Sequence, residues 1–398
     1  MCERVTYMSC DRELCHLSLR EITQFCAKML RVAIVILTVI NAFAASSSNE
    51  SSWELISPGG DTIWYVFSSK RINRSVNVSN DLQNHSGKGE AFTFLAKRGS
   101  VNKLLIEFMG GGACFSAVTC SLPEWLPAES ATATKLFLET KPGLHNPKQE
   151  TANWHAIYVP YCTGDGHVGN NTAHYADQTV HHFGGVNARA ALKYAFENFP
   201  DVEATLTAGQ SAGAVATYMW STYVMDHYPN ADHSMLADSY VPLFGKTGVT
   251  DGLKNWNMQS SFPRDIISAN YTRWMSYFPG WAASFATKVF NHFPKSRFGI
   301  YASNGDRVES SFYDVEGCGI EGCSWKKAMR VIMPWIRNNS TNVYTYIGTG
   351  SSHTQTVDNS EYSMKSDGVV LSDWINDLIT GAPDLQREVD CDPHCGWF

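Results

Sequence analysis

The sequence predicts an α/β protein built on a doubly wound, mostly parallel sheet, and three observations support this. Apolar runs of strand length recur along most of the chain. Segments with helical periodicity lie between many of them, which is the pattern of parallel strands joined by helices. Several apolar runs are also too uniformly apolar to have one face in water, which indicates a sheet covered by helices on both sides.

The expected strands are short and rich in aliphatic and aromatic residues. They cover residues 62–67, 92–95, 103–109, 155–160, 204–208, 235–241, 298–302 and 343–347. The expected helices repeat apolar residues every three to four positions. They cover residues 186–199, 212–227, 325–337 and 371–379. No internal repeat interrupts this order, so residues 45–398 are expected to form one domain.

One segment, residues 247–294, breaks the alternation because it has no strand pattern. It concentrates aromatic residues, namely Trp256, Phe262, Trp274, Tyr277, Phe278, Trp281, Phe285, Phe290 and Phe293. We expect a helical cap over the carboxyl edge of the sheet. The alternative is that these rings are ordinary core, which should hold for most of them.

Composition excludes two classes of protein. Hydrophobic residues make up 44% of the 398-residue chain and charged residues 17%, whereas a disordered chain has low hydrophobicity and high net charge. The formal net charge of −7, from 31 basic and 38 acidic residues, lacks the basic surface of a nucleic-acid-binding protein. The sequence therefore predicts a globular protein with a sizeable core and no nucleic-acid partner.

The N-terminal region, residues 1–44, has the pattern of a secretory signal peptide. The apolar run at 32–40 follows two basic residues and precedes the small-residue site Ala42-Phe43-Ala44. The run is too short to cross a bilayer, which takes about 20 apolar residues. The leader proper is expected at about 29–44, with Met29 as the better start, after an unusual extension over 1–28. A signal anchor that keeps the protein on a membrane is the alternative.

Cysteine usage and glycosylation sequons agree with export. Seven cysteines follow the leader: Cys114, Cys120, Cys162, Cys318, Cys323, Cys391 and Cys395. The close pairs 318/323 and 391/395 predict local disulfides in an oxidising compartment. With His394 the last pair offers only three soft ligands, where structural zinc takes four. Eight N-x-S/T sequons predict a glycosylated surface; they begin at Asn49, Asn73, Asn77, Asn84, Asn170, Asn270, Asn338 and Asn339.

The stretch Gly209-Gln210-Ser211-Ala212-Gly213 carries the clearest chemical signal. A predicted strand enters it and a predicted helix leaves it, which is the context of a nucleophile elbow that exposes a strained serine at a helix N-terminus. The alternative is an ordinary strand-to-helix turn with a serine N-cap. Two further features favour the elbow.

The first feature is the glycine run in Met109-Gly110-Gly111-Gly112-Ala113, directly after the strand 103–109. Glycines at this position let backbone N–H groups approach a substrate oxyanion. A phosphate-binding loop is the competing interpretation, but no lysine follows the glycines at the spacing of such a loop.

The second feature is His353, just past the candidate last strand. A triad on this architecture runs along the chain in the order serine, acid, histidine. The acid therefore belongs between Ser211 and His353, and Asp306 fits because it follows the strand 298–302. Asp314 is the alternative acid.

No pattern in the sequence requires a metal ion or an organic cofactor. The remaining clustered histidines lack the carboxylate spacing of a zinc site, and we interpret them as mainly structural or substrate-facing. They are His167, His174, His181 and His182.

Taken together, the motifs resemble the pectin acetylesterase/Notum family of secreted serine carboxylesterases. The resemblance rests on four stretches in family order: residues 105–114 (LIEFMGGGAC), 158–162 (YVPYC), 183–190 (FGGVNARA) and 209–213 (GQSAG). It implies an α/β-hydrolase fold, a nucleophilic Ser211 and oxyanion donors from Gly111, Gly112 and Ala212. It also implies framework disulfides among Cys114, Cys120 and Cys162.

The chain departs from the family in its substrate pocket more than in its triad. Ala113 stands where the family usually has a tryptophan, which predicts extra space beside the oxyanion site. Met109 replaces a glutamate, with Glu107 two positions earlier, and Cys162 is followed by Thr163. The resemblance implies a secreted esterase that removes O-acetyl groups from cell-wall polysaccharides such as pectin. Removal of longer acyl groups from a lipidated partner, peptide hydrolysis, and a non-catalytic binding protein on the same scaffold are the alternatives.

Overall fold

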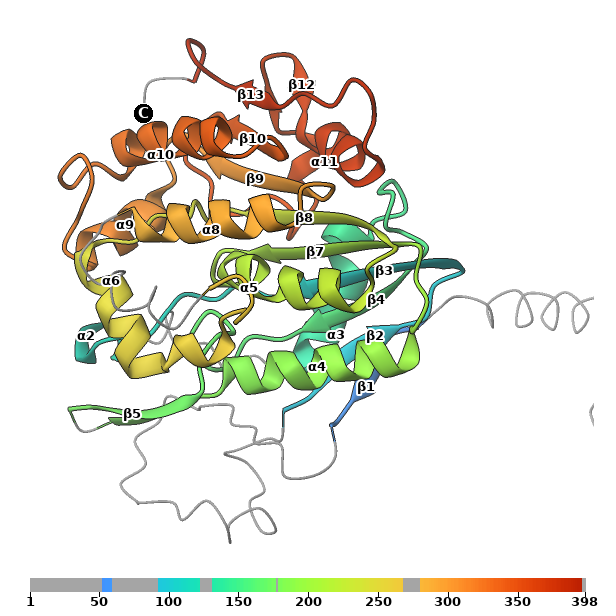
Figure 1. Cartoon of the computed structure of the whole chain (residues 1–398), viewed down its shortest axis with the longest axis horizontal. Coiled ribbons are helices and arrows are strands. Elements are labelled where there is room, and N and C mark those ends of the chain that lie inside the picture. The colour runs from blue at the N-terminus through green and yellow to red at the C-terminus, as the bar shows by residue number, and fades with distance from the viewer. Residues whose placement is uncertain (1–51, 59–91, 122–130, 177, 268–279, 396–398) are drawn as a thin grey trace, which may run out of the picture. The chain divides into compact units, whose positions relative to one another are not determined.

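The computed structural model describes residues 52–58, 92–121, 131–176, 178–267 and 280–395 (Figure 1). The predicted leader, the predicted strand at 62–67 and three of the cap's aromatic residues lie outside these ranges. Within them, no helix is long and apolar enough to span a bilayer.

The central element is a nine-stranded sheet with the strand order β1-β2-β4-β3-β7-β8-β9-β10-β13. Its strands are β1 (Glu54–Ile56), β2 (Phe94–Lys97), β3 (Val101–Phe108), β4 (Trp154–Val159), β7 (Ala204–Gln210), β8 (Asp232–Asp238), β9 (Arg297–Ser303), β10 (Val343–Gly348) and β13 (Glu388–Asp390). From β4 to β13 all neighbours run parallel, and β1 and β2 close one edge with antiparallel pairs. The predicted mostly parallel sheet is confirmed.

Helices cover both faces of the sheet, as the uniformly apolar strands predicted. The α-helices of the described residues are α2 (Ala117–Cys120), α3 (Ala131–Thr140), α4 (Gly184–Asn198), α5 (Ala212–His227), α6 (Lys246–Asp251), α8 (Trp281–His292), α9 (Arg307–Val315), α10 (Trp325–Asn339) and α11 (Leu371–Thr380). Helices α4, α5, α8 and α10 share one hydrophobic core with one sheet face, and α3 and α11 pack on the other. Figure 1 shows α4, α5 and α8 in front of the sheet.

Strand β3 shows why an apolar run predicted this arrangement. Leu104, Ile106 and Phe108 are buried in one core and Leu105 in the other. Because successive side chains of a strand point to opposite faces, a strand buried on both sides has no polar alternation. Edge strand β13 escaped prediction because its three residues, Glu388–Asp390, contain no apolar run.

The predicted cap needs a correction. Its described start is helical, with α6 followed by a π-helical turn at Gly252–Trp256 and a 3₁₀ turn at Met258–Ser261. Helix α8, however, packs against α5 and α10 and leads directly into β9. It is a crossover helix of the sheet, and its rings, such as Phe285 and Phe290, belong to the main core. Aromatic density does not separate a cap from a large helix packed on a sheet.

Among the described residues, three disulfides form between cysteines close in sequence: Cys114–Cys120, Cys318–Cys323 and Cys391–Cys395. The two predicted local pairs are confirmed. Cys162 is instead a free, fully buried thiol, so the expectation that it belongs to a disulfide framework is wrong. Burial raises the pKa of this thiol to about 12, which keeps it protonated and unreactive.

Candidate active site

Ser211 occupies a strained turn between β7 and α5. Its backbone has φ 53° and ψ −120°, a region that costs a non-glycine residue on the order of 1–3 kcal/mol. The two flanking glycines make the turn possible. A Cβ on Gly209 would lie 2.2 Å from the carbonyl oxygen of Gly213, and one on Gly213 would lie 2.0 Å from that of Phe108. The motif therefore has the packing that a nucleophile elbow requires.

The glycine loop after β3 lies against this elbow. A Cβ on Gly110 would lie 2.5 Å from the carbonyl oxygen of Gln210. Gly111 and Gly112 have φ values of 151° and 80°, which side-chain-bearing residues rarely adopt. Gly112, Ser211 and Ala212 line one cavity, so the backbone N–H groups of Gly112 and Ala212 are candidates for binding an oxyanion there. Gly111, the third predicted donor, is not among the lining residues.

A buried histidine forms a hydrogen bond with the residue that precedes the glycine loop. The His167 Nε2 atom lies 2.8 Å from the carbonyl oxygen of Met109. Burial lowers the pKa of His167 to about 4, so the ring is neutral, and Nε2 must carry its proton to donate to a carbonyl. This places His167 in a structural role, one of the two roles that the sequence suggested for it.

The His167 turn depends on Asp165, a residue that sequence reasoning missed. The fully buried Asp165 carboxylate accepts hydrogen bonds from the N–H groups of His167, Gly169 and Gly184, at 2.8–3.1 Å. Burial raises its pKa to about 6, although these bonds oppose the shift. The dense Gly-Asp-Gly-His sequence directly after β4 was the available signal.

Asp306 and His353 are in direct contact. The Asp306 Oδ2 atom lies 2.9 Å from His353 Nδ1. The other oxygen, Oδ1, caps α9 by accepting the N–H groups of Val308 at 2.9 Å and Glu309 at 3.0 Å. The carboxylate is fully buried and its orientation is fixed from both sides. It can hold the histidine with the proton on Nδ1, which leaves Nε2 free to accept one.

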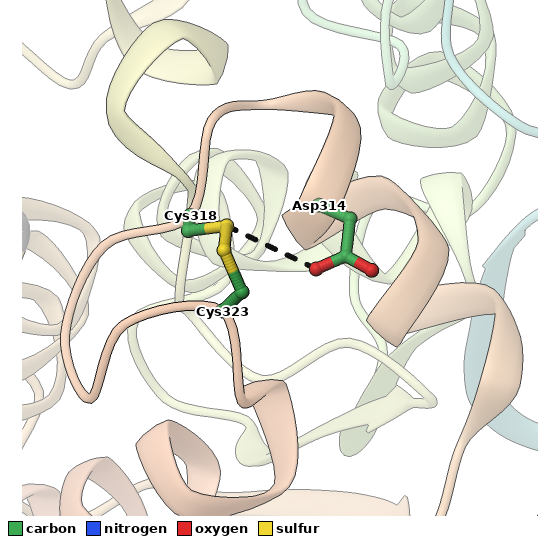
Figure 2. A group of neighbouring side chains, drawn as sticks. All are labelled: Asp314, Cys318 and Cys323. Atoms are coloured by element: carbon green, nitrogen blue, oxygen red, sulfur yellow. Dashed lines mark hydrogen bonds between the residues drawn. A yellow bond between two sulfur atoms is a disulfide. The ribbon is translucent and has the colours of Figure 1, made fainter.

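Asp314, the alternative acid, lies elsewhere. It is exposed at the end of α9, and its Oδ1 is 3.9 Å from Cys318 Sγ (Figure 2). It does not contact His353 in the structure. Asp306 is therefore the acid that the geometry favours.

Two adjacent residues, Asp238 at the end of β8 and Ser239 after it, anchor the loop that follows His353. Asp238 also anchors the turn at Ser211. The carboxylate of Asp238 accepts the N–H groups of Gln355 at 2.9 Å and Thr356 at 2.8 Å. The Ser239 hydroxyl accepts the N–H of Thr354 at 2.8 Å. The main chain of Asp238 in turn accepts the N–H of Ser211 at 2.8 Å. His353 and Ser211 are thereby held at the same sheet edge.

His353 has one unused nitrogen. Its Nε2 atom is buried and has no hydrogen-bond partner among the residues that the structure describes. A buried imidazole nitrogen without a partner is costly, and such a group calls for a functional explanation. A serine hydroxyl turned toward it, or the hydroxyl of a substrate, would supply the partner.

Two spaces of different size adjoin the candidate triad. The cavity at Ser211 measures about 50 Å³ and is walled by aromatic rings and by two carboxyl groups, Glu309 and Glu316. Trp256 lines it beside Ala113, so the missing loop tryptophan does not leave a large void. The groove at His353 measures about 570 Å³ and has polar walls that include Lys141, Asp358 and Lys365.

The groups that could suggest a metal site have another explanation. Asp314 gathers with Cys318 and Cys323, and Asp390 with Cys391 and Cys395. Figure 2 shows that the sulfurs of the first group are joined to each other, and those of the second are joined as well. A disulfide offers no thiolate to a metal ion, so neither group supports a metal centre.

Comparison with known proteins agrees with this geometry. The family model for Pectinacetylesterase matches residues 87–247. Over these residues the chain is similar to the pectinacetylesterase family. The match includes the glycine loop and the serine elbow, and it supports an esterase. The contact between Asp306 and His353 lies beyond the matched residues, so it is an independent observation. A search of curated proteins found no match.

The elbow around Ser211 should not tolerate a methyl group at Gly213. In the Gly213→Ala variant the methyl would press on the Phe108 carbonyl, so β3 or α5 must shift. We expect a loss of about 1–3 kcal/mol in the free energy of unfolding together with a loss of esterase activity. Urea unfolding measures the first. Gly252→Ala is the control, since the nearest atom there is 3.3 Å away on a side chain; an equal effect in both variants would contradict the elbow geometry.

The acid can be tested by paired substitutions. Asp306→Asn should lower kcat on p-nitrophenyl acetate by about 10⁴, because an amide favours the wrong histidine tautomer. Asparagine is also a good N-cap, so α9 should persist and the melting temperature should change little. Asp314→Asn should leave kcat within two-fold of the parent, whereas a large loss in that variant alone would transfer the role to Asp314.

Proposed function

We propose that the protein is a secreted serine esterase that removes short acyl groups, O-acetyl first among them, from polysaccharides. The observation that carries this proposal is the unequal space on the two sides of the candidate triad. A small cavity adjoins Ser211 and a large polar groove adjoins His353.

In the proposed mechanism His353 moves every proton. Its Nε2 takes the proton of Ser211 as the hydroxyl oxygen attacks the ester carbonyl, and Asp306 stabilises the resulting imidazolium through Nδ1. The N–H groups of Gly112 and Ala212 bind the oxyanion of the tetrahedral intermediate. A donor of this kind is worth about 2.7–4 kcal/mol in a comparable protease. The alcohol leaves with the proton from His353, and water activated by the same nitrogen releases the acid from Ser211.

This mechanism places the alcohol half and the acyl half of the ester on different sides of the candidate triad. The leaving alcohol must lie beside His353, because that residue protonates it. The acyl group stays on Ser211 with its oxygen toward Gly112 and Ala212, so its substituent enters the cavity that these residues line. By the same measure of volume, a cavity that holds one water needs about 10–15 Å³. A space of about 50 Å³ therefore suits an acetyl group and is too small for an octanoyl group.

The groove on the other side suits a polymer of sugars. It is open and polar, and Lys141 and Lys365 add positive charge to it, although Lys141 is paired with Asp358 at 4.0 Å. Local positive charge favours the binding of an acidic polymer such as pectin, in spite of the negative net charge of the chain. The leader pattern and the three disulfides support export.

A panel of esters tests the proposal. We expect kcat/KM to fall from acetyl to butyryl to octanoyl esters of p-nitrophenol, and we expect acetate release from acetylated pectin and xylan. Ser211→Ala should lose on the order of 10⁶ in kcat and keep its circular dichroism spectrum. Preference for octanoyl with no acetate from either polymer would contradict the proposal and favour a deacylase of lipidated partners. Full inactivity would favour a binding protein.

A further inference from the structure

The cavity beside Ser211 contains two carboxyl groups that the proposed mechanism does not use. Glu309 lies in the first turn of α9, and Glu316 follows the end of that helix. Their residues are only 9% and 6% exposed, and both line the cavity together with Ser211. An acyl-binding cavity for alkyl chains would be lined by apolar side chains, since burying a polar group without a partner costs free energy.

The backbone near Glu316 leaves room for its side chain. Its Oε2 atom accepts the N–H of Gly245 at 2.5 Å. A Cβ on Gly245 would lie 2.4 Å from the Cβ of Glu316, and one on Gly248 would lie 2.4 Å from its carboxyl carbon. Two glycines thus make room for this side chain, which packs as a built part of the cavity wall.

Burial and acidic neighbours favour the neutral form of both carboxyl groups. Within the described residues neither forms an ion pair, and the ionisable neighbours Asp251 and Asp306 are themselves acidic. Burial is the main cause that raises the pKa of Glu316 to about 8 and that of Glu309 well above its usual range. A protonated carboxyl has an O–H donor, so the cavity wall presents hydrogen-bond donors to whatever occupies it.

We propose that Glu309 and Glu316 are specificity-determining residues, which select short acyl groups that carry a hydrogen-bond-accepting oxygen. This inference rests on the proposed function, because it assigns the cavity to the acyl group. An acyl group longer than acetyl extends further into the cavity that the two acids line with Ser211. An alkyl chain there leaves their donors without partners, whereas an alkoxyacyl or hydroxyacyl group accepts a hydrogen bond.

Two esters of equal shape test this directly. The p-nitrophenyl esters of methoxyacetic and butyric acid differ only in the replacement of a methylene by an oxygen. The kcat/KM of each is divided by its rate constant for hydrolysis by hydroxide, which removes the intrinsic difference in reactivity. We expect the corrected ratio to favour methoxyacetyl by about 3- to 10-fold, the range that one net hydrogen bond supplies.

Paired variants separate the donor from the shape of the side chain. Glu316→Met should lower the corrected ratio toward 1, and Glu316→Gln should retain the preference, because an amide also donates. Glu309→Met and Glu309→Gln repeat the comparison at a residue that does not hold Gly245, in case Glu316→Met fails to fold. Release of butyrate by the Met variants should rise relative to the parent.

The outcomes distinguish this inference from the proposed function. A corrected ratio near 1 in the parent enzyme, or a preference unchanged in the Met variants, would overturn the role of the two acids while acetyl ester hydrolysis remained. Loss of acetyl ester hydrolysis in the parent itself would instead overturn the proposed function.

Discussion

The candidate site depends on the hydrogen bonds that Asp238 accepts from the histidine loop and from the serine turn. Ser211 and His353 come from different crossovers of the sheet, and nothing in their local sequence brings them together. Asp238 accepts the N–H groups of Gln355 and Thr356, and the Ser239 hydroxyl both donates to Asp238 and accepts the N–H of Thr354. The main chain of Asp238 meanwhile binds the serine turn. One buried acid thus fixes the positions of Ser211 and of the loop that carries His353.

A second set of polar contacts extends this anchor across the sheet. The Gln210 side chain donates to Thr356 at 3.1 Å and to Glu107 at 2.5 Å, and His145 lies 2.8 Å from the other oxygen of Glu107. Each of these groups is buried, so leaving one without its partner would cost about 1–3 kcal/mol. The network couples the correct folding of β3 and β7 to the position of the histidine loop.

Asp306 and Glu309 are three residues apart, and their different surroundings suit them to different roles. Asp306 accepts two backbone N–H groups and faces His353. Glu309 is buried beside two other acids, and burial raises its pKa well above the usual range. The first is suited to hold a histidine, and the second to offer a proton to a ligand. Divergent environments of this kind distinguish the roles of paired carboxyl groups.

The sequence could predict what depends on local pattern. The sheet followed from apolar runs, the strand-to-helix turn at Ser211 from Gly209 and Gly213, and the contact of Asp306 with His353 from the place of each residue after a strand. Asp238 could not be predicted, because the contacts by which it anchors the histidine loop are largely to backbone N–H groups, which no residue type marks. Asp165 was marked only by its place between two glycines. The free Cys162 and the crossover role of α8 depend on tertiary packing. Glu309 and Glu316 likewise became candidates only when the two ends of α9 proved to line the cavity.

The measurement that tests the central claim most directly is the site of covalent labelling by a fluorophosphonate probe. Digestion and mass spectrometry of the labelled protein should find the adduct on the peptide with Ser211. The Ser211→Ala variant should not be labelled, and labelling of Asp306→Asn should be much slower than that of the parent. An adduct on another serine, or equal labelling of parent and Ser211→Ala, would contradict the account.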